Sequence, residues 1–160
     1  MSCKKQLILA IFVAVAFTSP RAQSLHDKIQ ARAAESGKPR DVPGGTTFSV
    51  PMPADRAFDA VVKYFQIHDS AIDESSKKEL GQLITAMKIV DVGGFRNNNK
   101  GYRTYVTFIH DSDSSTTVKV KVTIQQRSNH GQPDPWSEPK ILDKETADTT
   151  AELKAALGAS

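Results

Sequence analysis

The tetrapeptide Ile-His-Asp-Ser occurs twice in the chain, at residues 67–70 and at residues 109–112. His, Asp and Ser are the side chains of a hydrolase triad, in which serine attacks a carbonyl carbon and histidine takes the serine proton. Consecutive residues seldom converge in this way, because neighbours on a strand point to opposite faces. The sequence also lacks the Gly-x-Ser-x-Gly elbow that exposes a nucleophile in many hydrolases. We therefore interpret both copies as stop signals, where Asp and Ser turn the backbone after an apolar stretch.

Metal binding is the second chemistry that these residues could support, if the two copies met in space. The histidines are His26, His68, His110 and His130, and no two of them have the i, i+4 spacing of a helical zinc site. Residues 111–122 lack the glycine and the final glutamate of a calcium-binding loop. A histidine in the last turn of a helix is explained by the helix dipole instead. We expect no metal ion, no cofactor and no enzymatic activity.

The N-terminus has the three parts of a secretory signal peptide. Lys4 and Lys5 form a basic start, residues 7–17 are an uncharged apolar run, and Ala22 and Ser24 are the small residues of a cleavage site. The run is too short to cross a bilayer, which needs about 20 apolar residues. We expect residues 1–24 to be removed, with cleavage after Ala22, a buried helix or an uncleaved anchor as alternatives. The expected destination is the periplasm, with the extracellular medium as the other possibility.

The cysteine and charge content of the mature chain excludes several classes of protein. Cys3 is the only cysteine and precedes the apolar run, whereas a lipoprotein cysteine would follow it. The mature chain would therefore have no disulfide and no thiolate nucleophile. Lys4, Lys5 and Arg21 are three of the 21 basic residues and no acidic residue precedes Asp27, which leaves 18 basic and 18 acidic side chains after cleavage. A neutral chain lacks the basic face of a nucleic-acid-binding protein.

Hydrophobic periodicity predicts a single α+β domain over residues 46–160. The order β-α-β-β-β-α predicts a mainly antiparallel four-stranded sheet with two helices on one face. Before this domain we expect a short helix in residues 25–36 and a flexible linker in residues 37–45, where prolines and a Gly-Gly pair oppose regular structure. The expected strands are residues 46–50, 82–90, 102–110 and 116–126, and the expected helices are residues 54–66 and 142–158.

Two strands carry patterns that predict their place in the sheet. Residues 116–126 alternate strictly, with Val118 and Val120 on one face and Lys119 and Lys121 on the other. This pattern predicts one face against the core and one face in water. Residues 82–90 are apolar on both faces, which favours a central strand. The last two strands are expected to form an antiparallel hairpin.

Three short motifs follow one another along the expected domain. Val50-Pro51 ends a strand, residues 54–58 (Ala-Asp-Arg-Ala-Phe) begin a helix, and residues 81–85 (Gly-Gln-Leu-Ile-Thr) lead into a returning strand. In this order, and with a Pro-Trp pair before the last helix, residues 46–157 resemble small bacterial envelope domains, including the helix-grip domains of the BamC type. The resemblance implies a role in envelope interaction or assembly and carries no catalytic motif. Several of these families are lipoproteins, whereas this chain lacks a lipidation cysteine.

Arg103, Tyr105 and Trp136 are the candidate binding residues. Arg103 and Tyr105 share one face of their strand, which we expect to be the open side of the sheet, and Trp136 is the only tryptophan, in a Pro-rich loop. Aromatic side chains with a few polar anchors are typical of ligand sites. The alternative is that these aromatic residues complete the core and that Trp136 pins its loop across the sheet. Tyr102 and Phe95 are further candidates for the walls of such a site, and Arg96 is a further candidate for a polar anchor.

The sequence as a whole favours a non-catalytic binding protein of the bacterial cell envelope, secreted or periplasmic, with another envelope protein as its partner. The alternative is a carrier for a lipid or small molecule, with a pocket between helix and sheet.

We predict that the exported protein begins at Leu25, because Ala22 and Ser24 supply the small residues that signal peptidase requires. N-terminal sequencing of exported material measures this directly. Exported protein that still begins at Met1 would contradict the cleavage prediction.

Overall fold

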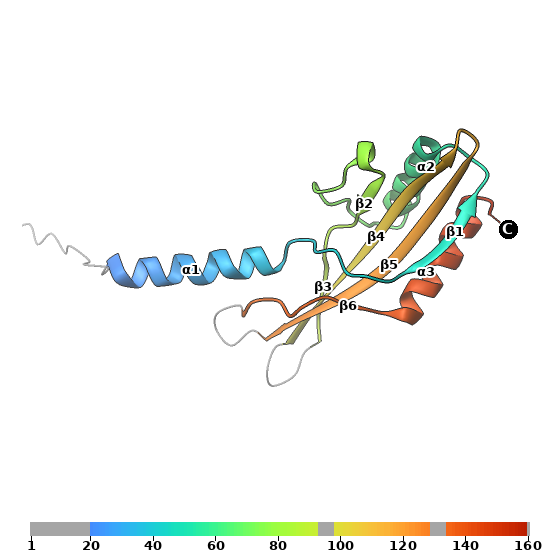
Figure 1. The fold of residues 1–160 in the computed structure, drawn as a ribbon. Coiled ribbons are helices and arrows are strands. Elements are labelled where there is room, and N and C mark those ends of the chain that lie inside the picture. The colour runs from blue at the N-terminus through green and yellow to red at the C-terminus, as the bar shows by residue number, and fades with distance from the viewer. Residues whose placement is uncertain (1–19, 93–97, 129–133, 160) are drawn as a thin grey trace, which may run out of the picture.

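A long antiparallel hairpin runs through the centre of the fold. The computed structural model describes residues 20–92, 98–128 and 134–159. Within these residues, β4 (Asn98–Ser112) and β5 (Ser115–Ser128) pair along almost their whole length (Figure 1). Both strands are rich in the β-branched and aromatic residues that favour strands. The expected antiparallel hairpin is confirmed.

Four short strands flank the hairpin and complete the sheet. Near the hairpin turn, β1 (Thr46–Val50) pairs with β5 and β2 (Gln82–Ile84) pairs with β4. Further along, β6 (Lys140–Ile141) pairs with β5 and β3 (Lys88–Asp91) pairs with β4. The predicted α+β class with an antiparallel sheet is confirmed, but in the described residues the sheet has six strands rather than four. One expected strand is divided in two, and β6 is too short to leave a pattern in the sequence.

The expected central strand at residues 82–90 is an edge segment. Its two parts, β2 and β3, both pair with β4, and the register gains one residue between the pairs Ile84–Tyr105 and Lys88–Tyr102. An extra residue of this kind switches which side chains face each side of the sheet. If residues 82–90 are taken as one continuous strand, this switch makes apolar residues fall on both of its faces. The prediction of a central strand is therefore wrong.

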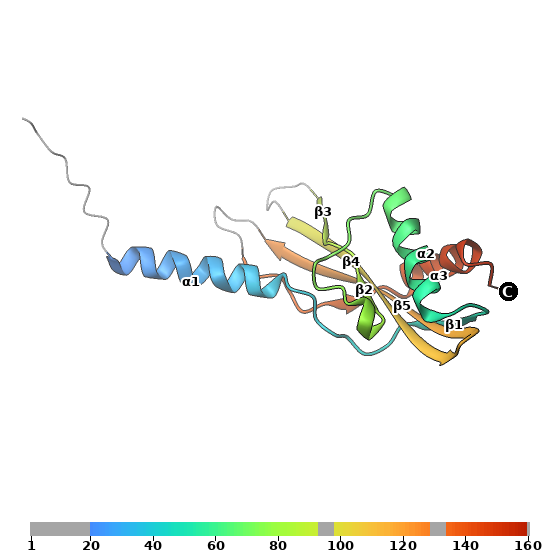
Figure 2. The same ribbon diagram turned by 90° about the horizontal axis from the view of Figure 1, so that it is seen from above.

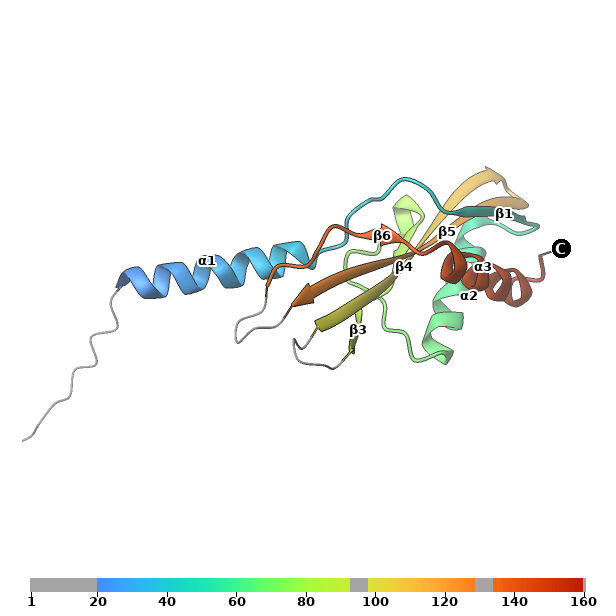
Figure 3. The same ribbon diagram turned by 90° about the horizontal axis from the view of Figure 1, so that it is seen from below.

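Two helices cover one face of the sheet and a third points away from it. Helices α2 (Ala54–Ile67) and α3 (Asp143–Ala156) contact each other and pack on the same face (Figures 1 and 2). The 3-10 turn η1 (Lys78–Leu80) leads into β2. Helix α1 (Pro20–Ser36) projects from the body of the fold (Figure 3). No helix in the described part of the chain is long and apolar enough to cross a membrane.

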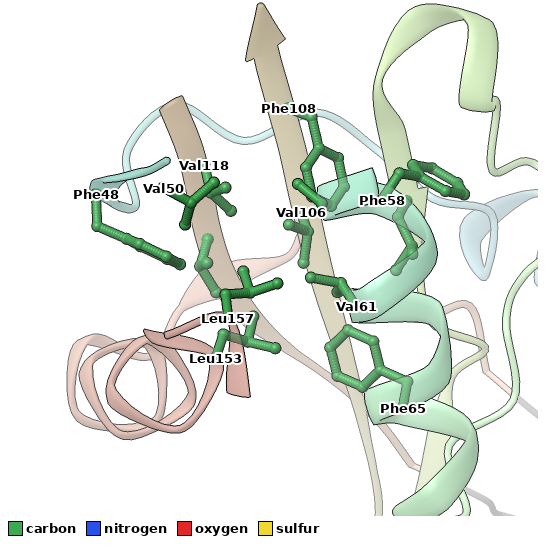
Figure 4. Close-up of a cluster of buried hydrophobic side chains, with 13 residues drawn as sticks. Phe48, Val50, Phe58, Val61, Phe65, Val106, Phe108, Val118, Leu153 and Leu157 are labelled. Atoms are coloured by element: carbon green, nitrogen blue, oxygen red, sulfur yellow. The ribbon is translucent and has the colours of Figure 1, made fainter. Parts of the chain in front are cut away.

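The hydrophobic core fills the space between α2, α3 and the sheet (Figure 4). Phe58, Val61 and Phe65 recur at helical spacing on α2 and are buried, as predicted. Leu153 and Leu157 contribute the matching apolar stripe of α3. Burying one such side chain stabilises the fold by about 1.5–3 kcal/mol. The sheet supplies the other side, through Phe48, Val50, Leu83, Val106, Phe108, Val118 and Val120.

A short hydrogen bond joins the two core helices at their outer surface. The Tyr64 hydroxyl on α2 donates to the Glu152 carboxylate on α3 at 2.5 Å. Burial of Tyr64, together with its hydrogen bond to Glu152 and the negative charge of that residue, raises the pKa of Tyr64 from 10.0 to about 12. The pKa of Tyr64 is higher in the folded protein than in the unfolded chain, so the protonated hydroxyl favours the folded state. This contribution to the free energy of unfolding is fully present below about pH 10 and is lost as the pH rises toward 12.

We predict that Glu152→Gln lowers the pKa of Tyr64 toward its ordinary value, because the neutral amide removes the charge and leaves burial as the main cause of the shift. Tyrosinate absorbance during an alkaline titration measures the change. The exposed Glu145 on the same helix provides the matched control Glu145→Gln, which should titrate like the wild type. Superimposable curves for the two variants would contradict the prediction.

Candidate functional site

The second face of the sheet, which points away from α2 and α3, is polar and yet largely covered. The alternation predicted for β5 is confirmed, since its valines face the core. From the sequence we expect the opposite face to lie in water, but Lys121, Thr123 and Gln125 are only 6%, 1% and 3% exposed. Much of their cover is formed by the last turn of α1 and the extended segment that follows it, residues 33–42, which we call the strap. The residues expected to form a flexible linker thus include a segment that lies against the sheet (Figure 1).

Side chains of the sheet cap the end of α1 and hold the start of the strap. The last carbonyl groups of a helix have no partner within the helix. Gln125 donates from Nε2 to the Ser36 carbonyl at 3.1 Å, and Arg103 donates from one terminal nitrogen to the Gly37 carbonyl at 2.9 Å. A cation at this position also complements the negative end of the helix dipole. The sheet therefore provides the acceptor groups of α1 with the donors that they lack.

The far end of the strap is held by Lys121 and Tyr105. The Lys121 ammonium donates to the Val42 carbonyl at 2.7 Å and to the Asp41 carboxylate, and it lies 5.2 Å from the centre of the Tyr105 ring. The Tyr105 hydroxyl accepts a hydrogen bond from the Arg40 backbone N–H at 3.2 Å. The hydrogen bond from Lys121, and its charge, hold the pKa of Asp41 below its ordinary value. Because the Asp41 side chain is 94% exposed, we expect this ion pair to position the strap rather than to add much stability.

Trp136 fastens the Pro-rich loop to the start of the strap. Its backbone N–H donates to the Ser36 hydroxyl at 2.7 Å, and that hydroxyl donates to the Ala33 carbonyl at 2.8 Å. The indole packs directly on backbone at two glycines, because a β-carbon at Gly101 or Gly37 would lie only 3.1 Å or 3.2 Å from the ring. A β-carbon at Gly37 would press on the ring, and one at Gly101 would meet the Met87 side chain as well as the ring.

The three candidate residues chosen from the sequence lie on this second face. Arg103, Tyr105 and Trp136 are 6%, 7% and 8% exposed, so the strap and the loop cover residues that we expect on an open surface. Arg103 also donates to the Thr85 carbonyl at 3.3 Å and approaches the Asp73 carboxylate at 3.4 Å. Its charge is therefore satisfied within the protein. Arg103 is better suited to shaping a site than to binding a ligand directly.

A groove of about 1140 Å³ remains open beside the strap. The strap and the end of α1 form one wall, the loop of residues 73–75 forms the other, and β2 and β4 form the floor. Arg103, Tyr105 and Trp136 all line it. Its volume is slightly above the range of roughly 300–1,000 Å³ that is typical of ligand sites, so a small ligand or part of a larger one would fit. The groove is the place where this fold could receive a ligand.

Several residues of the groove have no distinguishing pattern in the sequence. Lys121 and Arg127 occupy polar positions of an alternating strand, which is the pattern of a solvated face. Only the strap, about 80 residues earlier in the chain, makes that face an interior. Tyr102 lies on the opposite face of β4, because side chains alternate along a strand. Phe95 and Arg96 lie outside the described residues.

The two Ile-His-Asp-Ser copies do not form a common site. His68 lies at the C-cap of α2 and packs against Tyr64, with ring centres 4.4 Å apart and the rings tilted by 42°. His110 lies in β4 beyond Phe108, which packs on Phe58 at the start of α2. The two histidines are therefore separated by most of the length of α2. Asp69 adopts a left-handed backbone conformation, with a φ of 53°, as expected where the chain turns.

The described residues contain no group of three or more His, Cys, Asp or Glu side chains arranged to hold a metal ion.

The fold and the groove define an α+β protein with an apolar face under two helices and a polar face under a strap. No family model and no curated protein matches the sequence. Among solved structures, the chain is similar to a DUF4468 family protein from Bacteroides ovatus, with 14% sequence identity and a TM-score of 0.39. The match covers 82% of this chain and 95% of that chain. A similarity at this level carries no argument about function.

We predict that Ser36→Ala destabilises the protein by about 1–3 kcal/mol, because it leaves the buried N–H of Trp136 without an acceptor. Urea unfolding measures the loss, and the emission of Trp136, the only tryptophan, should shift to longer wavelength as the loop loosens. The matched control is Ser114→Ala in the exposed hairpin turn, which should change stability by less than about 0.5 kcal/mol. Equal stability of the two variants would count against this role for Ser36.

Proposed function

We propose that the mature protein is a non-catalytic binding protein of the bacterial cell envelope, and that its binding site is the groove beside the strap. The observation that carries the proposal is the convergence of Arg103, Tyr105 and Trp136 along one groove, since aromatic side chains with a polar anchor are typical of ligand sites. The N-terminal 24 residues support export. The expected partner is another envelope protein.

The position of the groove favours a polar partner over a lipid. The expected carrier would hold its ligand between helix and sheet, but that interface contains the packed core, and the groove lies on the opposite face. The groove is lined by Arg103, Lys121 and Asp73 among other polar side chains. An acyl chain would remove the water that remains around these charged groups, at a cost in binding free energy.

An exposed apolar edge gives independent support for a binding role. Ile89, Val90 and Val92 are 53%, 41% and 50% exposed at or just after β3. In the described sheet, β3 pairs only with β4. Apolar side chains gathered at the edge of a sheet are typical of surfaces that partner proteins cover.

We predict that Thr107→Trp abolishes partner capture. Thr107 lies on β4 and lines the groove, so an indole at this position would obstruct it. The measurement compares the envelope proteins retained by immobilised wild-type protein and by the variant, identified by mass spectrometry. Lys63→Trp is the matched control, because Lys63 is exposed on α2 and is not among the residues that line the groove.

The wild type and Lys63→Trp should retain the same proteins, and Thr107→Trp should lose them. Thermal unfolding of both variants separates a blocked groove from a damaged fold. If a folded Thr107→Trp variant retains the wild-type set of proteins, the groove is not the binding site.

A further inference from the structure

Arg127 holds a fixed position at one end of the groove. It lies near the end of β5, opposite Asn99 of β4, and lines the groove together with Trp136. Its guanidinium carbon is 4.5 Å from the centre of the Trp136 ring. A guanidinium stacked on an indole keeps its hydrogen-bonding edge free, because the ring engages only its face. Trp136 is itself held by Ser36 and by the backbone at two glycines, so the stack has a rigid base.

The Nε atom of Arg127 is buried and has no hydrogen-bond partner, and it is the only such buried side-chain nitrogen or oxygen in the described part of the chain. A buried donor on a charged group that lacks an acceptor is costly, and native proteins rarely leave one without a reason. A ligand from outside the chain cannot reach Nε itself, but an oxyanion on the terminal nitrogens would offset the cost of holding this guanidinium without an acceptor.

The other cations of the groove are already engaged. Arg103 pairs with Asp73, Lys121 with Asp41, and Arg40 with Glu138. These pairs also occupy two of the carboxylates that line the groove, so neither competes for Arg127. The remaining lining carboxylate, Glu74, is exposed on the loop that forms the opposite wall.

We propose that Arg127 binds an oxyanion of the ligand, a carboxylate or a phosphate, and that the rest of the ligand extends into the groove. The inference rests on the proposed binding function and adds the chemical class that the site selects. A guanidinium presents its N–H groups in a planar fork that matches two oxygens of a carboxylate or a phosphate. Because Nε is shielded from solvent, the terminal nitrogens of Arg127 form the fork that the oxyanion can reach. The stack on Trp136 holds the guanidinium in place before the ligand arrives, which lowers the entropy cost of binding.

The single tryptophan provides the test. Uniformly ¹⁵N-labelled mature protein is titrated separately with inorganic phosphate and with acetate, at ionic strength held constant with sodium chloride. The indole N–H signal of Trp136 and the Nε–H signal of Arg127 should shift in a saturable way with at least one anion. Phosphate alone would indicate a phosphate-bearing ligand, acetate alone a carboxylate-bearing ligand, and both would indicate a site for either oxyanion.

Three variants make the result specific to Arg127. Arg127→Gln should weaken anion binding about tenfold or more, because a charged hydrogen-bonded contact is lost. Arg127→Lys, which keeps the charge without the planar fork, should be intermediate and tests the proposal if the glutamine variant does not fold. Arg56→Gln, on the exposed side of α2, should bind like the wild type.

The proposal is overturned if the wild type shows no saturable shift with either anion, or if folded Arg127 variants bind as tightly as the wild type. Neither result would contradict partner capture blocked by Thr107→Trp. That combination would instead mean that the groove binds a ligand through groups other than an oxyanion.

Discussion

The second face of the sheet is covered because its side chains donate hydrogen bonds to the carbonyl groups of the strap. A segment that lies on a protein surface brings backbone acceptors that need partners once water is removed. Gln125, Arg103 and Lys121 supply donors to the carbonyl groups of three strap residues, Ser36, Gly37 and Val42. The groove exists because these bonds hold the strap at one place on the sheet, where it forms a wall.

The two faces of the hairpin are stabilised by different interactions, apolar burial on one face and hydrogen bonds on the other. The face under α2 and α3 buries apolar surface, which is favourable in almost any orientation and tolerates swaps of similar volume. The face under the strap is held by directional bonds, so each donor needs its acceptor at the right distance and angle. A polar interior of this kind can define the shape of a binding site more closely than an apolar core can. The groove lies on this second face.

The groove is lined by cations in ion pairs and by one cation, Arg127, that stacks on an aromatic ring instead. Arg103 and Lys121 lie in ion pairs that shape the walls, whereas the guanidinium of Arg127 rests on Trp136 with a buried N–H that lacks an acceptor. Rigid support of one unsatisfied group, close to open space, is the arrangement that a binding site requires. The exposed apolar edge at β3 offers additional surface to a protein partner.

The sequence by itself determined the elements that depend on local periodicity: helix α2 with its buried stripe at Phe58, Val61 and Phe65, and the alternating strands of the hairpin. It also placed Arg103 and Tyr105 on one face, since that follows from alternation along a strand. It could not determine what covers that face, because the alternation of Lys121 and Gln125 is the same whether they meet water or a distant segment. Tertiary structure decided this through contacts between the strap and strands some 65 to 90 residues away, such as Arg40 to Tyr105 and Ser36 to Gln125, which no local pattern records.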